Sequence, residues 1–325
     1  MIPSLGGAAA RLLAARTVVA LDRSRCVRHR FARSSCRHCT EVCSSGAVRW
    51  TEQGLAVASG TCSLCLLCTA VCPTQALRSP GQHLSALIND LSAHARPVLG
   101  CRKHPADAVH GRLPCLGSLA SAHLLLLLDL LFPDGLQINL SQCRGCENER
   151  ILPAIGDVRQ RLAAAGWKSR ITFIDDPRMI DCQPSALSRR EMLTFFKMRS
   201  ARSASQVAGQ ILEQSTIKPY GDKKQPETHA LLMKVLERQP EDARARQAWQ
   251  LIAPALEVSA QCSGCSGCIG ICPAGALTPA TDEKSAPHYS ARLCLACGLC
   301  ASFCRRKAIH LQPPVMMTVA PVHPL

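Results

Sequence analysis

Short apolar runs alternate with longer ones in the middle of the chain. Three short runs are rich in Val, Leu and Ile, as buried strands are, and they lie at 97–100, 136–140 and 170–174. Two longer runs, at 116–132 and 151–165, repeat apolar residues at helical spacing. This alternation predicts an α/β domain with a small, partly parallel sheet over residues 96–181.

Outside this region the pattern predicts smaller elements. Apolar residues at 47–50 and 55–57 flank a turn at 52–54, which predicts a β-hairpin. Residues 184–257 are polar and helical in pattern, which is typical of a helical spacer. The tail after Gln312 is expected to be irregular.

Two further segments of the spacer have local signatures. Ser188 and Glu191 have capping-box spacing, so the paired arginines between them are interpreted as a helix start rather than a twin-arginine export motif. The stretch 219–227 is rich in Lys, Gly and Pro and is expected to be an exposed loop.

Length and composition place the chain among soluble multidomain proteins. Its 325 residues suffice for two or three domains, and 47% are hydrophobic, which excludes disorder throughout. Arg11 and Arg16 interrupt the only apolar stretch near the N-terminus, so no signal peptide is expected. The run 124–132 contains Asp129 and is shorter than the ~20 residues that span a bilayer, so a buried helix is expected there. Together these features predict a cytoplasmic protein without a transmembrane segment.

Cysteine changes this picture, because the chain contains 21 of them. Fifteen fall into four clusters arranged as two pairs, which indicates a distant internal duplication. The first pair is Cys36-x2-Cys39-x3-Cys43 with Cys62-x2-Cys65-x2-Cys68-x3-Cys72-Pro73, and the second is Cys262-x2-Cys265-x2-Cys268-x3-Cys272-Pro273 with Cys294-x2-Cys297-x2-Cys300-x3-Cys304.

This spacing suits an iron–sulfur cluster. A Cys-x2-Cys-x2-Cys loop wraps around a cubane and supplies three thiolates, while the fourth Cys ligates the neighbouring cluster. The paired motifs resemble the bacterial two-cluster ferredoxins over residues 23–80 and 258–312, about a third of the chain. The resemblance implies two [4Fe-4S] clusters in each module. Zinc-ribbon spacing lacks the third Cys, and cysteines this close cannot meet disulfide geometry locally, so both alternatives are weaker.

The resemblance also implies a ligand set for each cluster. In the C-terminal module the sets are Cys262, Cys265, Cys268 and Cys304, and Cys294, Cys297, Cys300 and Cys272. In the N-terminal module one set is Cys62, Cys65, Cys68 and Cys43, and the other contains Cys36, Cys39 and Cys72.

The last of these sets lacks one ligand. Arg33 stands where the first Cys of the motif belongs, and Cys26 is the nearest substitute. The alternative is that Cys26 is a buried thiol and the site holds a three-iron cluster or none. Ser44 and Arg305 replace the Pro that usually follows the fourth Cys, which is expected to loosen those turns without removing a ligand.

The middle region has a further set of cysteines at predicted strand–helix junctions, namely Cys101, Cys115, Cys143 and Cys146. Helix N-termini stabilise thiolates, so these positions suit a fifth cluster, [2Fe-2S] or [4Fe-4S]. The sequences 113–117 and 143–146 resemble the delta subunit of methyl-viologen-reducing hydrogenases, which passes electrons between a hydrogenase and heterodisulfide reductase. A second Cys two or three residues after Cys101, common in that family, is missing. A thioredoxin-like [2Fe-2S] ferredoxin or a domain with structural thiols are the alternatives.

Charge and the remaining motifs bear on the partner. The formal net charge is +15; each [4Fe-4S] cluster with four thiolates carries about −2, so part of the excess is counter-charge and part can serve docking to an acidic partner. Aromatics are only 3%, which leaves little material for stacking on nucleic acid. His104, His110 and His123 form no metal-site pattern. Gly264 and Gly267 are expected to let backbone amides approach cluster sulfurs.

The sequence therefore predicts an α+β protein: two ferredoxin-like 2[4Fe-4S] modules, an intervening small α/β domain and a helical spacer. The expected divisions are 1–22, 23–80, 96–181, 184–257, 258–312 and 313–325. The expected function is electron relay between redox-enzyme partners that are hydrogenase-like, formate dehydrogenase-like or heterodisulfide reductase-like. The alternatives are an oxidoreductase subunit whose middle cluster reduces a disulfide or sulfur, and a non-redox scaffold or assembly protein.

Overall fold

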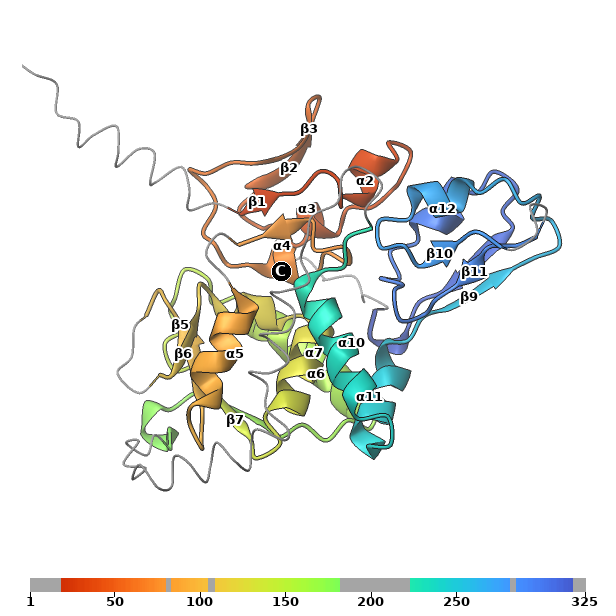
Figure 1. The fold of residues 1–325 in the computed structure, drawn as a ribbon. Helices are drawn as coiled ribbons and strands as arrows, with labels where there is room; N and C mark the ends of the chain where they lie inside the picture. The colour runs from red at the N-terminus through yellow and green to blue at the C-terminus, as the bar shows by residue number, and fades with distance from the viewer. Residues whose placement is uncertain (1–18, 80–82, 105–108, 182–222, 281–284, 318–325) are drawn as a thin grey trace, which may run out of the picture.

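The computed structural model of the chain consists of short helices and small sheets in three regions (Figure 1). It describes residues 19–79, 83–104, 109–181, 223–280 and 285–317. We call residues 19–79 the N-terminal module, 83–181 the middle domain and 255–317 the C-terminal module. Within the described residues, no helix is long and apolar enough to cross a membrane.

The middle domain contains a four-stranded sheet in the order β6-β5-β7-β8. All its pairs are parallel, and its strands are β5 (Val98–Cys101), β6 (Gly111–Leu113), β7 (Leu136–Asn139) and β8 (Ile171–Ile174). Leu99 pairs with Gly111 on one side and with Ile138 on the other. The three predicted strands are confirmed. The sequence did not predict β6, because three residues are too few to show a period of two.

The helices of this domain correct one prediction. The run expected to be a single helix over 116–132 forms a 3₁₀ turn, η1 (Leu116–Leu119), and then helix α6 (Ala122–Leu131). Ser121 has extended backbone angles, and its hydroxyl accepts a hydrogen bond from Leu124 N at 3.4 Å. This N-cap starts α6 afresh, because capping requires a non-helical residue.

Two other helices complete the domain. Helix α7 (Ile151–Ala164) confirms the second predicted helix. Helix α5 (Leu84–Ser92) was not predicted, and it buries Leu84, Leu87, Ile88 and Leu91. The buried apolar run expected from 124 onward is confirmed, since the leucines at 124–128 are all buried in α6.

Helices α10 (Glu227–Arg238) and α11 (Ala243–Ile252) lie in the predicted helical spacer, whose last residues, 255–257, belong instead to strand β9 (Ala255–Val258). Helix α10 starts inside the stretch expected to be loop, and the predicted capping box at Ser188 lies outside the described residues. The tail is not wholly irregular: η3 (Val315–Met317) buries Met316, whose carbonyl accepts a bond from Arg161.

A buried carboxylate fastens α11 to the middle domain. Asp129 of α6 is 1% exposed and accepts hydrogen bonds from Ser169 Oγ at 2.6 Å, Trp167 Nε1 at 3.3 Å and Arg170 N at 3.0 Å. It also pairs with Arg244 Nη2 of α11 at 2.6 Å. The guanidinium of Arg244 lies 4.3 Å from the centre of the Trp167 ring.

Replacing Asp129 with Ala is expected to destabilise the protein by about 3 kcal/mol, because it leaves buried donors and the Arg244 cation without their partner. Calorimetric unfolding measures this change. Asp157→Ala is the control: Asp157 pairs with Arg161 one turn along an exposed helix face, so a change below about 0.5 kcal/mol is expected. Equal effects of the two variants would contradict the anchoring role of Asp129.

The two terminal modules repeat one order of elements. The N-terminal module runs β1 (Ala20–Leu21), α3 (His38–Glu41), β2 (Val48–Thr51), β3 (Gly54–Val57), α4 (Leu67–Ala70) and β4 (Leu77–Arg78), with a short helix α2 (Val27–Arg30) added before α3. The C-terminal module runs β9 (Ala255–Val258), α12 (Gly267–Ile271), β10 (Leu277–Thr278), β11 (His288–Tyr289), α13 (Leu299–Phe303) and β12 (Ile309–Gln312).

Strand pairing repeats as well. In each module the first strand pairs antiparallel with the last, and the two middle strands form an antiparallel pair. The hairpin predicted around residues 52–54 is the β2–β3 pair. The two modules therefore share one topology, as an internal duplication would produce.

The modules differ in how they are held. One hydrophobic core joins the N-terminal module, the middle domain and helices α10 and α11. The C-terminal module has two small clusters of its own, and their buried members are Cys272, Ala274, Ala276 and Leu295, and Cys268, Leu277 and Ile309. Cysteines thus form a large part of a very small core.

Candidate iron–sulfur sites

The structure groups the predicted ligands into five sites, numbered in chain order. Their members are Cys26, Cys36, Cys39 and Cys72 (site 1); Cys43, Cys62, Cys65 and Cys68 (site 2); Cys101, Cys115, Cys143 and Cys146 (site 3); Cys262, Cys265, Cys268 and Cys304 (site 4); and Cys272, Cys294, Cys297 and Cys300 (site 5). All are free thiols. The leftover Cys182 lies outside the described residues.

Three of the sites each surround a hollow. The four cysteines of site 1 line one pocket, those of site 5 line a second, and those of site 4 line a third. The grouping follows the predicted exchange: Cys72 lines the site 1 pocket and Cys272 lines the site 5 pocket, each away from the loop that precedes it in sequence.

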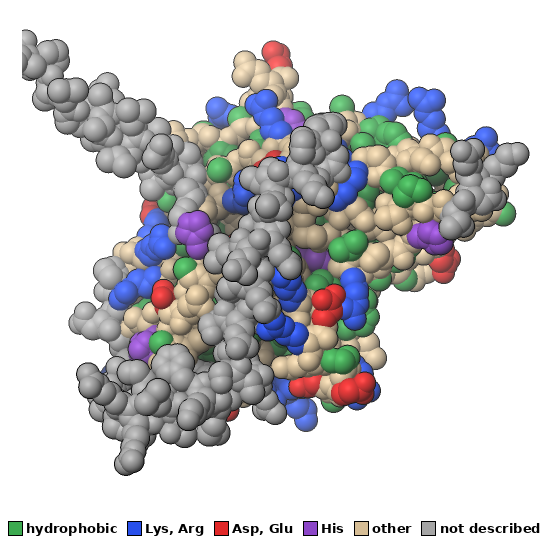
Figure 2. Space-filling model, in the orientation of Figure 1, with side chains coloured by type: hydrophobic (Ala, Val, Ile, Leu, Met, Phe, Trp, Pro, Cys, Tyr) green, Lys and Arg blue, Asp and Glu red, His purple; other side chains and the backbone are tan. Residues whose placement is uncertain are grey.

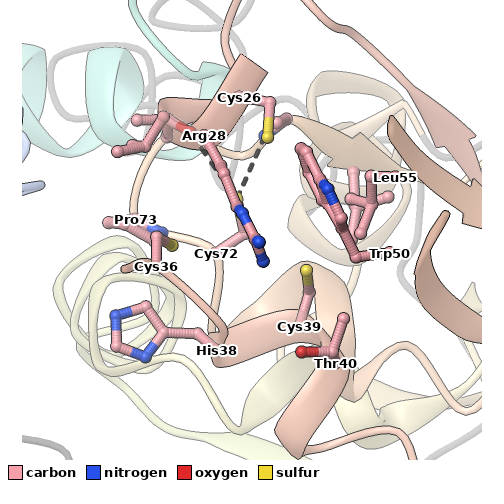
Figure 3. A pocket seen from close by; sticks show the side chains of 14 residues that line it. Cys26, Arg28, Cys36, His38, Cys39, Thr40, Trp50, Leu55, Cys72 and Pro73 are labelled. Carbon is pink, nitrogen blue, oxygen red and sulfur yellow. Dashed lines mark hydrogen bonds between the residues drawn. The ribbon is translucent and has the colours of Figure 1, made fainter. Parts of the chain in front are cut away.

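Site 1 includes Cys26, the predicted substitute ligand (Figure 3). Cys26 precedes helix α2, and this extra helix brings the chain back toward α3. The guanidinium of Arg28, two residues after Cys26, lies 4.2 Å from the centre of the Trp50 ring, and Arg28 also lines the pocket. Its buried Nε has no hydrogen-bond partner among the described residues. Site 1 therefore has four thiols and one cation, and the sequence patterns did not indicate the cation.

In sites 2 and 3 the cysteines lie close enough for the charge of one thiolate to raise the pKa of another. Burial raises the pKa of Cys68, and the charges of Cys65, Cys43 and Cys62 raise it further. Burial likewise raises the pKa of Cys143 to about 12, with added contributions from Cys101, Cys115 and Cys146.

The same causes recur elsewhere, since burial raises the pKa of Cys39 and of Cys300 to about 12. The charges of nearby thiolates contribute to both of these raised pKa values. Thiols held in this way favour their protonated form by themselves. A cationic iron core reverses the preference, because it stabilises thiolates that otherwise repel one another.

One hydrogen bond recurs at the fourth Cys of all four motifs. The thiol sulfur accepts a bond from a backbone N–H shortly downstream, as the four pairs Val48–Cys43, Ala76–Cys72, Ala276–Cys272 and Ala308–Cys304 show at 3.3, 3.3, 3.4 and 3.4 Å. The donor N–H lies four residues after the Cys in three of the turns and five residues after it in the turn that follows Cys43. This turn has Ser44 in place of the usual Pro. The turn after Cys304 also lacks Pro, but its N–H donor lies four residues after the Cys, as in the turns that contain Pro.

The backbone of the ligand loops also repeats. In three motifs the residues on both sides of the second Cys have positive φ, and these pairs are Leu64 and Leu66, Gly264 and Ser266, and Ala296 and Gly298. Each non-glycine in this conformation costs roughly 1–2 kcal/mol. Backbone of this kind is typical of the anion-binding concavities found at many iron–sulfur sites.

Two details depart from expectation. Gly264 has φ +69°, which favours glycine, whereas a Cβ on Gly267 would lie 2.8 Å from the Phe303 ring. Gly267 therefore makes room for an aromatic side chain. The described residues of the first motif, which lacks its first Cys, have no pair with positive φ around Cys36.

Site 3 lies at the carboxyl edge of the parallel sheet, as predicted. Cys101 ends β5, Cys115 follows β6 and precedes η1, and Cys143 follows β7. Parallel strands end at one edge, so the topology brings these thiols together. This edge is the usual place for ligands in open α/β sheets.

Two polar side chains beside site 3 were not predicted from the sequence. His104 Nε2 lies 3.3 Å from Cys146 Sγ, and Asn148 Nδ2 donates to Cys115 Sγ at 3.8 Å. His104 stands three residues after Cys101, where the resembling family often has a further Cys, and that position was the available signal. Lys103 pairs with Glu147 across the site.

Site 3 adjoins site 2 directly. Asn148 also donates to Ser63 O at 3.1 Å, and Arg150 Nη2 donates to Cys65 Sγ at 3.7 Å. A Cβ on Gly117 would lie 1.9 Å from Cys65 O, so the backbones of η1 and the site 2 loop meet where only glycine fits. The charge of Cys65 contributes to the raised pKa of Cys115.

The two terminal modules also meet near their sites. Phe31 and Phe303 pack edge to face, with ring centres 5.3 Å apart. Arg30 donates to the carbonyls of Ile271 at 2.9 Å and Gly270 at 3.2 Å. These contacts join the segment between Cys26 and Cys36 to helix α12, which carries Cys268, and to helix α13, which carries Cys300.

Among the described residues, no three His, Cys, Asp or Glu side chains are gathered closely enough to hold a single metal ion. The four thiolates of a [4Fe-4S] cluster each bind a different iron, so they lie further apart than the ligands of a single metal ion. Four thiols at each site, with a hollow beside the thiols of sites 1, 4 and 5, fit such a group.

No model of a known protein family matches the chain, and no curated protein is significantly similar to it.

Proposed function

We propose that the protein is an iron–sulfur electron carrier. Four [4Fe-4S] clusters occupy sites 1, 2, 4 and 5, and a fifth cluster of two or four irons occupies site 3. The clusters accept one electron each, and the protein supplies ligands, hydrogen bonds and a low-dielectric surrounding that set their potentials.

One observation carries the proposal: the repeated backbone of the ligand loops. Left-handed leucine, serine and alanine residues are strained, and strain of this kind persists where the surroundings or a ligand require it. Here it occurs on both sides of the central Cys in three separate loops. The repeated N–H to sulfur bond at the fourth Cys supports the same role, since such bonds stabilise the negative charge of a bound cluster.

The contacts between sites favour relay over separate storage. Site 3 adjoins site 2 through Cys65 and Cys115, and site 2 adjoins site 1, because the charge of Cys39 acts on Cys68. Site 4 adjoins site 5, because the charge of Cys268 acts on Cys300. The Phe31–Phe303 contact lies between the two halves. The proposed path therefore runs through all five sites.

The partners in this proposal are redox enzymes of hydrogenase-like, formate dehydrogenase-like or heterodisulfide reductase-like type, in the reducing cytoplasm. A reducing compartment suits a chain whose described cysteines are all free. The resemblance of residues 96–176 to an electron-transferring hydrogenase subunit suggests site 3 as one end of the path.

Iron and acid-labile sulfide per chain test the function on anaerobically purified protein. We expect about 18 to 20 irons, from four cubanes and a fifth cluster, and EPR signals of reduced clusters after dithionite. About 16 irons would remove the fifth cluster from the proposal. Zinc in place of iron, or little iron and no EPR signal, would overturn the proposed function.

A further inference from the structure

The pocket of site 4 differs from those of sites 1 and 5 in being a wide, open groove between the two terminal modules. We call it the site 4 groove. The N-terminal module contributes Phe31 and Arg33, and the C-terminal module contributes the ligand loop and the turn after Cys304. Cys265 lies in this groove and is the only exposed thiol among the described cysteines.

The groove is strongly cationic. Arg33, Arg305, Arg306 and Lys307 all line it and are all exposed. No Asp or Glu is among the described residues that line it. Figure 2 shows Lys and Arg side chains along the upper edge of the C-terminal module.

Arg33 gives this groove a specific origin. It stands at the position that would carry the first Cys of the first motif, and Cys26 has taken the place of that ligand in the site 1 pocket. Position 33 therefore need not carry a thiol for site 1, and its arginine lines the site 4 groove instead. Ser44, which also departs from the motif, lies in neither pocket.

We infer that the site 4 groove docks an acidic, one-electron carrier protein, which exchanges electrons with the chain through the cluster at Cys265. This inference rests on the proposed function. Efficient exchange needs an exposed cluster edge, and Cys265 supplies the exposed ligand. Four exposed cations that line one groove attract a partner of opposite charge and accelerate encounter by 10- to about 10³-fold at low salt.

The balance of the step is simple. One electron leaves the reduced carrier and enters one cluster, so the carrier is oxidised by one electron and the cluster is reduced by one electron. No bond forms or breaks, and no proton is required.

The test uses the full-length holoprotein and reduced flavodoxin, a small acidic one-electron carrier, as the probe. Stopped-flow spectroscopy gives the second-order rate constant of cluster reduction from low salt to about 1 M, where the Debye length falls to about 3 Å. The groove variant is R33E/R305E/R306E. Its matched control is K168E/R170E/R246E, which changes the net charge equally at exposed positions near β8 and on α11.

We expect the groove variant to react at least tenfold more slowly than wild type at low salt, and at nearly the same rate at high salt. The control variant should lose less than threefold. Methyl viologen radical, a cationic donor, should reduce the groove variant no more slowly than wild type. EPR redox titration of each variant shows whether an altered potential, rather than docking, accounts for any change in rate.

Equal slowing of the groove and control variants would overturn the docking inference, since net charge alone would then explain it. So would a rate without salt dependence, or a single-stranded oligonucleotide that binds the groove and displaces flavodoxin. Each of these results leaves the proposed function intact. Failure of methyl viologen to reduce any cluster would overturn the proposed function itself.

Discussion

Replacing Cys26 with serine is expected to lower the iron content by between one and about four atoms per chain, because site 1 keeps only three thiolates. Cys26 lines the same pocket as Cys36, Cys39 and Cys72. Arg33 lines a different pocket and carries no ligand atom. With three ligands the site retains a three-iron cluster or loses its cluster entirely.

Iron and sulfide analysis together with EPR of oxidised and reduced protein measures this effect. A three-iron cluster gives a signal in the oxidised protein that the wild type lacks, whereas complete loss removes one reduced-cluster signal. Cys182→Ser is the matched control, since Cys182 is the cysteine that the five sites leave unassigned. Unchanged iron and EPR spectra in the Cys26→Ser variant would show that Cys26 is only a buried thiol.

Gly117→Ala is expected to have the second large effect. The new methyl carbon would lie 1.9 Å from Cys65 O and 2.9 Å from Ile151 Cγ2. A backbone oxygen cannot turn aside as a flexible side chain can, so η1 and the site 2 loop must separate. Overpacking of this kind costs about 1–3 kcal/mol. It should also disturb sites 2 and 3 together, since both loops meet at this contact.

Thermal unfolding and EPR of the reduced protein measure the two consequences. Gly156→Ala is the control in the same domain: no atom lies within 4 Å of its new Cβ, and it lies within α7. A helix interior favours Ala over Gly by roughly 0.5–1 kcal/mol, so this variant should be slightly stabilised. If Gly117→Ala leaves stability and the signals of sites 2 and 3 unchanged, η1 does not contact the Cys65 loop as described.

The small core of the C-terminal module explains why cluster loss should matter for folding as well. Cys268 and Cys272 belong to its two hydrophobic clusters, which contain few other buried side chains. Domains with so little buried apolar surface depend on metals or disulfides for stability. The cysteines of sites 4 and 5 therefore have a structural role besides their proposed redox role.

Much of the local structure could be predicted from the sequence alone. The spacing within each Cys motif confines three thiols to one loop, so grouping of neighbouring ligands follows from chain connectivity. The strands at 98–101, 136–139 and 171–174 also followed from local apolar pattern, because a buried strand needs such residues whatever its neighbours are. The break at Ser121 was missed, since the leucines beyond it continue an apolar run that masks a helix cap.

Only the tertiary structure decided how distant segments meet. No periodic pattern links Gly117 to Cys65, because this contact depends on the packing of whole elements rather than on neighbours in sequence. The grouping of Cys26 with Cys72 was an expectation from the ferredoxin resemblance, and the shared pocket shows the four side chains of that set together. The same holds for Arg33, which the motif marks only as a missing ligand. Its place beside Cys265 follows from the docking of one module on the other. Local spacing determines which cysteines share a loop, whereas packing determines which loops lie against one another and which thiol is exposed.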